Sequence, residues 1–137
     1  ARKPAPLGVP PPTSPAYTRP RMADTPQQAA AVRHRGSSVV LASGAGCGKT
    51  TVLTNRYLSH LAHDHADVPE VVAITFTERA ARQMRKRIRD AVERELRAAD
   101  PGSEGFARWD RHRRGLDAAP VATIHGFCGT LLRRHAA

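Results

Sequence analysis

Residues 43–50 read Ser-Gly-Ala-Gly-Cys-Gly-Lys-Thr, a glycine-rich run that ends in Gly-Lys-Thr. Glycines let backbone N–H groups close around phosphate oxygens, because no side chain stands in the way. Lys49 supplies a mobile positive charge for the terminal phosphates of a nucleotide, and the Thr50 hydroxyl is a suitable ligand for Mg²⁺. The sequence therefore predicts a phosphate-binding loop in which Lys49 and Thr50 act on the phosphates.

Two residues of this loop call for comment. Ser43 stands where the strict pattern has glycine, and serine adopts a positive φ less easily. Cys47 lies close to Lys49 and to the expected start of a helix, two features that make a thiol more reactive. Cys47 is therefore either sensitive to oxidation or a small residue that fills space, and we prefer the second interpretation.

The loop needs a strand before it and a helix after it, and the flanking residues fit both. Residues 39–42 are apolar and predict a strand over 38–42, while residues 51–61 carry an apolar stripe at helical spacing. Two further strands are predicted at 70–75 and 120–123, with helices at 26–35, 78–98, 106–113 and 124–134. Because strands and helices alternate, we expect an α/β fold with a parallel sheet flanked by helices.

The chain has 137 residues and a strongly positive charge. Lysine and arginine number 22 against 12 Asp and Glu, which gives a formal net charge of +10 and a pI near 11.1. Nucleic acid is the simplest partner for such a chain, although an arginine-rich composition alone gives the same balance. The two cysteines do not form a disulfide framework, and no stretch approaches the ~20 apolar residues of a membrane span. We expect a soluble cytoplasmic protein.

The two ends of the chain differ in composition. Residues 1–21 are rich in proline and in basic residues, and we expect them to form a disordered tail. Met22 stands where the composition changes, so one hypothesis is that the native chain begins there and that the tail is not native. Residues 22–137 form the expected globular domain, which we predict to be incomplete.

Three further motifs accompany the loop: Thr-Pro-Gln-Gln at 25–28, Thr-Phe-Thr-Glu-Arg-Ala-Ala at 75–81 and Thr-Ile-His-Gly-Phe-Cys at 123–128. The last two lie where a predicted strand meets a helix. The carboxyl ends of parallel strands line one crevice, so the junctions at Gly48, Thr77 and His125 should face the same side. We therefore expect all of these motifs to belong to one site.

In this order, the four motifs resemble the N-terminal part of the UvrD/Rep-type superfamily 1 DNA helicases, over residues 24–135. The loop and the Thr-Ile-His-Gly-Phe-Cys motif look closest to the AddA/RecB helicase–nuclease branch. The resemblance implies a truncated P-loop NTPase fold of RecA-like type, forming part of motor domain 1A. It also implies ATP-dependent 3'–5' helicase activity in DNA repair and recombination. The implied cofactors are ATP and Mg²⁺, and the implied partners are single-stranded DNA and a nuclease subunit in the parent complex.

The same resemblance assigns roles at matching positions. Gln28 corresponds to the glutamine that reads the adenine edge, Lys49 to the phosphate-binding lysine and Thr50 to the Mg²⁺-binding hydroxyl. The full set of nucleotide-binding positions is Gln28, Ser43, Gly44, Ala45, Gly46, Cys47, Gly48, Lys49, Thr50 and Thr51. The positions assigned to single-stranded DNA are Thr75, Phe76, Thr77, Arg79, Ala80, Thr123 and His125.

Elementary chemistry agrees with the DNA assignment. Hydroxyls and backbone amides at strand ends can hold phosphates, and an exposed phenylalanine offers a stacking face to any base. Basic side chains at the start of the long helix could add an electrostatic funnel. These are Arg79, Arg82, Arg85, Lys86 and Arg89.

Each of these assignments has a simpler alternative. Phe76 is alternatively a core residue at the strand end, and the arginine run is alternatively the solvated face of an amphipathic helix. His125 is alternatively a structural histidine, and Gln28 a residue on the surface of a helix. These alternatives stay open at the level of sequence.

A lone tryptophan and a histidine cluster complete the set of unusual residues. We expect Trp109 to pack against the sheet rather than to stack on a base. His60, His63 and His65 invite a metal interpretation, but no cysteine ligand lies near them. We interpret them as the solvated end of a helix.

Parts of a complete motor do not occur in the sequence. Asp24 stands where the family carries an apolar residue, beside the predicted adenine pocket. ATP hydrolysis needs a carboxylate for Mg²⁺ and water and cations for the developing charge, yet the chain has no Asp-Glu pair and no arginine-finger motif. We expect it to bind ATP and DNA without hydrolysing ATP by itself. A P-loop kinase or other nucleotide transferase and a non-catalytic DNA-binding module are the alternative functions.

Overall fold

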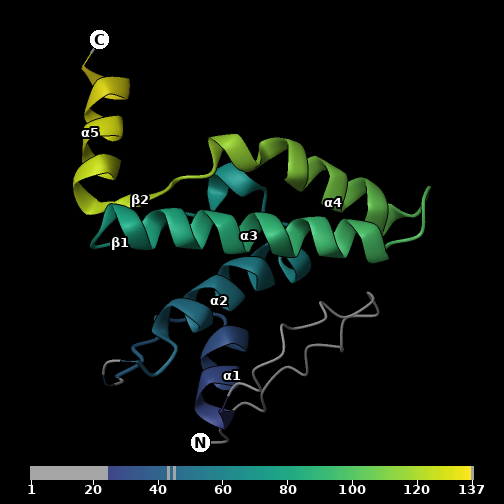
Figure 1. Cartoon of the computed structure of the whole chain (residues 1–137), viewed down its shortest axis with the longest axis horizontal. Helices are drawn as coiled ribbons and strands as arrows, with labels where there is room; N and C mark the ends of the chain where they lie inside the picture. Colours follow the sequence, from purple (N-terminus) through teal and green to yellow (C-terminus); the bar gives the residue numbers. More distant parts are fainter. Residues whose placement is uncertain (1–24, 43, 45, 137) are drawn as a thin grey trace, which may run out of the picture.

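The structure is a computed structural model that describes residues 25–42, 44 and 46–136. The proline-rich residues 1–21, Met22 and Asp24 lie outside the described residues, as do Ser43 and Ala45. In chain order the elements are α1 (Pro26–Arg33), α2 (Lys49–His63), a 3-10 turn (Val68–Glu70), β1 (Ala73–Thr75), α3 (Glu78–Ala98), α4 (Glu104–Gly115), a second 3-10 turn (Leu116–Ala118), β2 (Val121–Thr123) and α5 (Ile124–His135) (Figure 1).

Polar side chains at the helix starts explain where the helices begin. Thr25 and Gln28 form a capping box at α1, and Pro26 occupies the first helical position, where its missing N–H costs nothing. Thr77 caps α3 by accepting a hydrogen bond from the Ala80 N–H. The prediction of a helix over 78–98 is confirmed at both ends, whereas α1 ends two residues before the predicted limit of 35.

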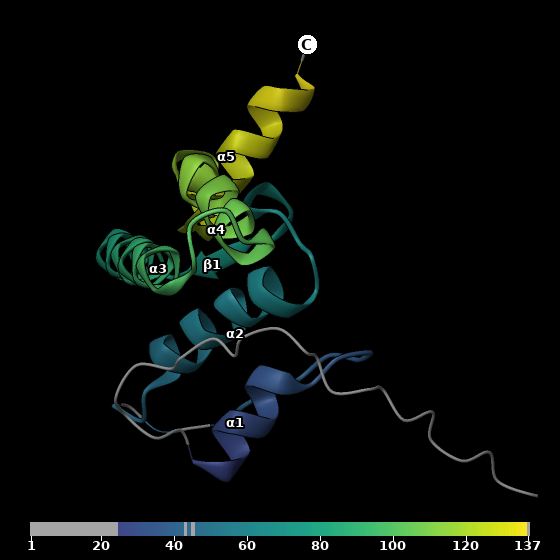
Figure 2. The same ribbon diagram turned by 90° about the vertical axis from the view of Figure 1, so that its right-hand side faces the viewer.

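The core lies between α2, α3 and α4, and it is mainly aliphatic. Its most deeply buried side chains, each less than 2% exposed, are Leu58, Leu61, Met84, Ile88, Val68, Val92 and Val121. Trp109 belongs to the same cluster and is 5% exposed, so the prediction that it packs rather than stacks is confirmed. In Figure 2, α3 and α4 lie side by side above α2, and α1 lies below α2.

The sheet of the described residues consists of two parallel strands. Ala73 pairs with Val121, Ile74 with Ala122 and Thr75 with Thr123. The parallel α/β arrangement predicted for these two strands is therefore correct. The strand predicted over 70–75 is shorter than expected, because residues 68–70 form a 3-10 turn with a capping box between Asp67 and Glu70.

The strand predicted over 38–42 is wrong for this structure. None of these residues is in a strand, and the side chain of Val40 is 93% exposed. A strand needs a neighbour that pairs with its backbone N–H and C=O groups, and within the described part of the chain none lies beside this segment. Its attachment is local: Leu41 packs against Ala31, Val32 and Val52.

α5 differs from the other helices because it has no buried residue. It leaves β2 and projects away from α3 and α4 (Figures 1 and 2). Leu132 on this helix is 70% exposed. None of the helices in the described ranges combines the length and the apolar character that crossing a bilayer requires.

Burial of His112 makes the stability of the domain depend on pH. The ring is 3% exposed and meets Trp109 edge-on, with 5.5 Å between ring centroids. Burial lowers the pKa of His112 below the ordinary value of 6.5, against the raising effects of the Leu61 backbone and Asp67. His112 therefore contributes stability that is present above pH 6.5 and is lost as the pH falls through its folded pKa.

We expect His112→Leu to flatten the fall in melting temperature between pH 7.5 and pH 5. The leucine keeps an apolar side chain in the core and removes the group that takes up a proton on unfolding. Thermal unfolding followed by circular dichroism measures the slope. His135→Leu, at the exposed end of α5, is the matched control and should leave the slope unchanged. Since burial also lowers the pKa of His63, some slope remains in the variant. Equal slopes for the wild type and His112→Leu would contradict this prediction.

Candidate nucleotide and nucleic-acid site

The glycine-rich loop has the backbone conformation that suits an anion. Gly46 and Gly48 have φ values of 80° and 73°, a left-handed conformation that glycine adopts without strain. Gly48 is the N-cap of α2, and its position provides no side chain to cap this helix. The first N–H groups of α2 therefore point toward the loop together with the positive end of the helix dipole. A phosphate group fits this arrangement.

Lys49 folds back over the loop that precedes it. Its Nζ donates a hydrogen bond to the Gly44 carbonyl at 2.9 Å, and its side chain is exposed. The ammonium group is thus held beside the glycines, where it would meet the oxygens of a bound triphosphate. Thr50 and Thr51 follow in the first turn of α2, each of them half-buried.

Gln28 connects α1 to the loop. Its Nε2 donates to the Cys47 carbonyl at 3.0 Å, and its Oε1 accepts from the Thr25 N–H at 2.8 Å. A primary amide has two N–H donors and two acceptor lone pairs, so each end of Gln28 keeps one for a ligand. A Cβ placed on Gly48 would lie 3.7 Å from the same Nε2. The residue predicted to read adenine is therefore adjacent to the residues predicted to hold phosphate.

A second group of predicted residues gathers where β1 and β2 end. Thr75 and Thr123 are direct partners in the sheet, and each is followed by the start of a helix. Between β1 and α3 lies Phe76, whose side chain is 96% exposed. The alternative that Phe76 is a core residue is therefore wrong. Thr77, Arg79 and Ala80 follow it, and of these three only Ala80 is half-buried.

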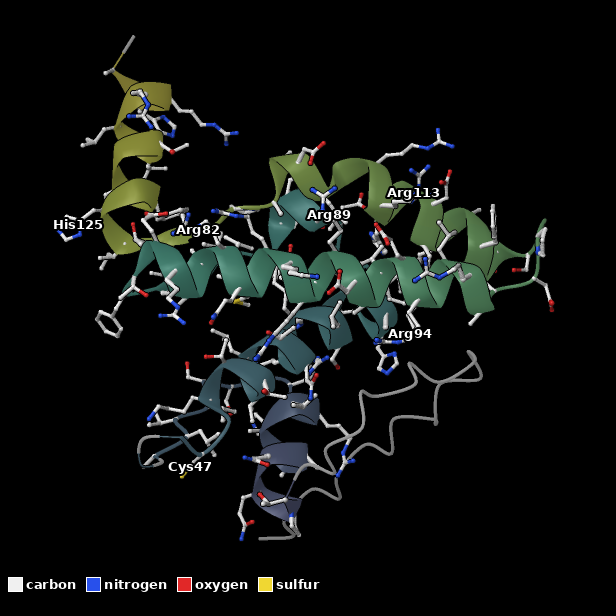
Figure 3. The ribbon with its side chains drawn as sticks, viewed as in Figure 1. Cys47, Arg82, Arg89, Arg94, Arg113 and His125 are labelled. Carbon is white, nitrogen blue, oxygen red and sulfur yellow. The ribbon has the colours of Figure 1, made fainter. Side chains whose placement is uncertain are left out.

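Thr123 differs from its neighbours because it lies below the surface. Its side chain is 7% exposed, and its hydroxyl accepts from the Gly126 N–H at 3.2 Å and donates to Glu78 Oε1 at 3.0 Å. Glu78 thereby joins the start of α3 to the start of α5. Nothing in the spacing of the sequence singled out Glu78, because its partner is 45 residues away. His125, in the first turn of α5, is exposed and points outward (Figure 3).

The predicted arginine funnel divides into two kinds of residue. Arg85 donates to the Val121 carbonyl at 2.6 Å and Arg89 to Asp117 at 2.8 Å, so these two tie α3 to the chain near β2. Lys86 pairs with Asp90 one turn along α3. Arg79 and Arg82, in the first two turns, are exposed near the β1–α3 junction. The cationic surface beside Phe76 is thus smaller than the sequence suggested.

The two groups lie on the same side of the molecule. Figure 1 shows that α2, α3 and α5 all begin on one side, shown at the left. In Figure 3, Cys47 of the loop and His125 of α5 both lie toward that side. This arrangement agrees with the expectation that the three junctions face one way.

The histidine cluster at the end of α2 has an ordinary structural environment. His60 Nδ1 lies 2.5 Å from Asp64 Oδ2, and burial lowers the pKa of His63 below its usual value. Across the ranges that the structure describes, no group of three or more His, Cys, Asp or Glu side chains could hold a metal ion.

A glycine-rich loop at the start of one helix, beside parallel strands that run into capped helices, is the arrangement of a nucleotide-binding α/β domain. The chain belongs to the UvrD/REP helicase N-terminal domain family, which residues 24–137 match. The predicted resemblance to UvrD/Rep-type helicases is therefore confirmed.

The particular relatives are A-type subunits of ATP-dependent helicase/nucleases. The chain is 40% identical over 113 residues to the A-type protein of this name from Desulforudis audaxviator. It is 37% identical over 111 residues to the corresponding protein from Alkaliphilus oremlandii. Each alignment covers 81% of this chain and 9% of the relative, so the chain spans about a tenth of the length of these curated relatives.

Proposed function

We propose that the chain is the ATP-binding and single-stranded-DNA-binding part of motor domain 1A in a DNA helicase of the helicase–nuclease kind. Membership of the helicase family and the names of the relatives support the class. The observation that carries the proposal is the shared side of the three helix starts, with the glycine-rich loop at α2 and the exposed Phe76 before α3.

In this proposal the nucleotide lies between α1 and the glycine-rich loop. Gln28 reads the adenine edge with its remaining donor and acceptor, and the N–H groups around Gly46 and Gly48 surround the phosphates. Lys49 moves from the Gly44 carbonyl to the terminal phosphates, and Thr50 offers its hydroxyl to Mg²⁺. The metal ion would neutralise charge on the phosphate oxygens.

DNA is proposed to lie across the ends of β1 and β2. The ring of Phe76 stacks on a base without regard to its identity, and Arg79 and His125 approach the backbone. Thr75 and Thr77 supply hydroxyls at the same edge. Thr123 supports the turn from within through Glu78. Stacking supplemented by a few cations gives a sequence-independent grip whose strength falls with salt.

The proposal includes a RecA-like sheet that is larger than the two strands seen here. The apolar side chains of Val72, just before β1, and Ile74 on β1 are 46% and 43% exposed, and Val40 is 93% exposed. Further strands beside β1 would cover these side chains and allow residues 38–42 to pair as a strand. We propose that the chain alone binds ATP without hydrolysing it, because no carboxylate of this chain is assigned to Mg²⁺ and water.

The remaining parts of the proposal concern the longer parent protein. They are 3'–5' movement on DNA, a role in repair and recombination, and assembly with a nuclease partner. They rest on the family and on the names of the relatives. A cytoplasmic location fits the two exposed free cysteines, Cys47 and Cys128, which suit a reducing compartment.

We expect the 137-residue chain to bind single-stranded oligothymidylate, and Phe76→Ala to weaken that binding about tenfold. Stacking on an aromatic side chain contributes about 1–3 kcal/mol per base, and about 1.4 kcal/mol corresponds to a factor of ten. Fluorescence anisotropy with a labelled oligonucleotide at low and moderate salt measures the affinity. The melting temperature should not change, because the side chain is 96% exposed.

Leu132→Ala is the matched control for the loss of an exposed apolar side chain, since Leu132 is 70% exposed on α5. It should leave DNA affinity unchanged. If Phe76→Ala bound as tightly as the wild type, the proposed stacking role would be wrong. Binding of ATP without any binding of DNA would favour the kinase or nucleotide-transferase alternative.

A further inference from the structure

α1 carries the predicted adenine-reading residue, yet it is too short to hold its own place. It has 8 residues, and isolated helices shorter than about 12–15 residues are marginal in water. Its buried side chains Ala31 and Val32 meet Val52 of α2 in a cluster separate from the main core. The position of Gln28 therefore depends on how α1 is attached to α2.

Two arginines make that attachment at the C-terminal end of α1. Arg56, from the middle of α2, donates through Nη1 to the carbonyls of Ala31 and His34, the second at 3.1 Å. Arg35, just after α1, donates through Nη1 to the carbonyls of Val32 at 2.9 Å and His34 at 3.1 Å. The last carbonyls of a helix lack partners within the helix and carry the negative end of its dipole. Both guanidinium groups therefore cap α1.

Arg35 also reaches the C-terminal end of α2. Its Nε donates to Asp64 Oδ2 at 2.6 Å, and its Nη2 donates to the Ser59 hydroxyl at 2.9 Å. Burial acts to raise the pKa of Asp64, but the hydrogen bonds from Arg35 and His60 outweigh it and hold the pKa below its usual value. One planar guanidinium thus joins α1 carbonyls to an α2 carboxylate, a geometry that lysine cannot reproduce in full.

The two ends of α1 are therefore attached to α2 by different contacts. At its start, Gln28 bonds to the Cys47 carbonyl in the loop before α2. At its end lie the contacts of Arg35 and Arg56, which we call the arginine clamp. The 8 residues of α1 span about 12 Å, so a change of helix angle at the clamp moves Gln28 by an appreciable part of a hydrogen-bond length.

We propose that the arginine clamp is a positioning device that sets Gln28 in register with the glycine-rich loop, and that Arg35 and Arg56 thereby determine the preference for adenine over other bases. This inference rests on the proposed function, because it assumes that Gln28 faces the base. The clamp acts on base selection and leaves phosphate binding unchanged, since Gly46, Gly48 and Lys49 do not belong to α1.

The test compares ATP and GTP, each with Mg²⁺ and a fluorescent group on the ribose, binding to the 137-residue chain. The wild type should prefer ATP. Arg56→Met and Arg35→Met should each lower ATP affinity about tenfold, which is about the loss of one well-placed hydrogen-bonding contact, and leave GTP affinity unchanged. Arg56→Lys keeps a charged donor and should recover part of the preference. Arg33→Met, on an exposed arginine in the last turn of α1, is the matched control and should bind as the wild type does.

A double-mutant cycle separates positioning from general damage to the fold. Gln28→Ala should remove the preference for ATP, and adding Arg56→Met to it should change nothing further, because the clamp acts through Gln28. A wild-type chain that binds no nucleotide, or binds ATP and GTP equally, overturns the proposed adenine site and the clamp with it. A wild-type preference that survives Arg35→Met and Arg56→Met overturns the clamp alone. An equal fall in ATP and GTP affinity also overturns it, because the clamp would then support the whole loop.

Discussion

Replacing Lys49 with alanine is expected to lower the affinity of the chain for ATP with Mg²⁺ about a hundredfold. A hydrogen bond to a charged group is worth about 1.5–3 kcal/mol, and Lys49 contributes a full positive charge beside the phosphates. The upper end of that range corresponds to a factor of about a hundred. Because the side chain is exposed and bonds to the Gly44 carbonyl of the loop, away from the core, folding should be unaffected.

Isothermal titration calorimetry with ATP and Mg²⁺ measures this loss, and a melting curve checks the fold. Lys86→Ala is the matched control, because Lys86 is an exposed lysine that pairs with Asp90 on the outer surface of α3. It removes the same charge from the chain and should leave ATP affinity nearly unchanged. Equal losses for the two variants would mean that net charge, and not the position of Lys49, governs the binding of the triphosphate.

The helices could be predicted from the sequence because their signals are local. Thr25 with Pro26, and Thr77 with Glu78, are capping patterns whose partners lie within four residues. The limits of α3 followed from such signals and from its apolar periodicity. The same holds for the glycine-rich loop, whose geometry depends on residue types that follow one another along the chain.

The strand over 38–42 could not be predicted correctly from its own residues. Apolar character indicates that a segment can be buried in a sheet, but a strand forms only where a neighbour supplies hydrogen bonds. β1 and β2 satisfy that condition for each other, although Ala73 and its partner Val121 lie far apart in the sequence. Val40 has no such neighbour among the residues that the structure describes, and it is exposed in consequence.

The supports of the candidate site were missed for a related reason. Glu78 bonds to Thr123 across 45 residues, and Arg35 to Asp64 across 29. No local pattern marks such contacts, since an arginine or a glutamate on the surface of a helix reads the same with or without a distant partner. The sequence thus indicated which residues could contact ligands, and the structure adds those that hold them in place.

The second large effect is expected in the core, where Leu61→Ala should destabilise the domain by about 3 kcal/mol. Leu61 is 0% exposed and belongs to the cluster formed by α2, α3 and α4. Removing a buried leucine side chain costs the lost burial and leaves a cavity, together about 2–5 kcal/mol. Domains of this size are typically stable by about 5–15 kcal/mol, so the variant loses a large part of its stability.

Urea unfolding followed by circular dichroism measures the change, and Leu53→Ala on the same helix is the matched control. Leu53 is 39% exposed, so its loss should cost less than about 1 kcal/mol. The comparison also bears on the site, because α2 begins at Lys49 and joins the glycine-rich loop to the core. At temperatures where Leu61→Ala remains folded, ATP affinity should be close to that of the wild type. Equal destabilisation by the two variants would contradict the assignment of Leu61 to the core, whereas a loss of ATP affinity in the folded variant would mean that core packing also sets the loop geometry.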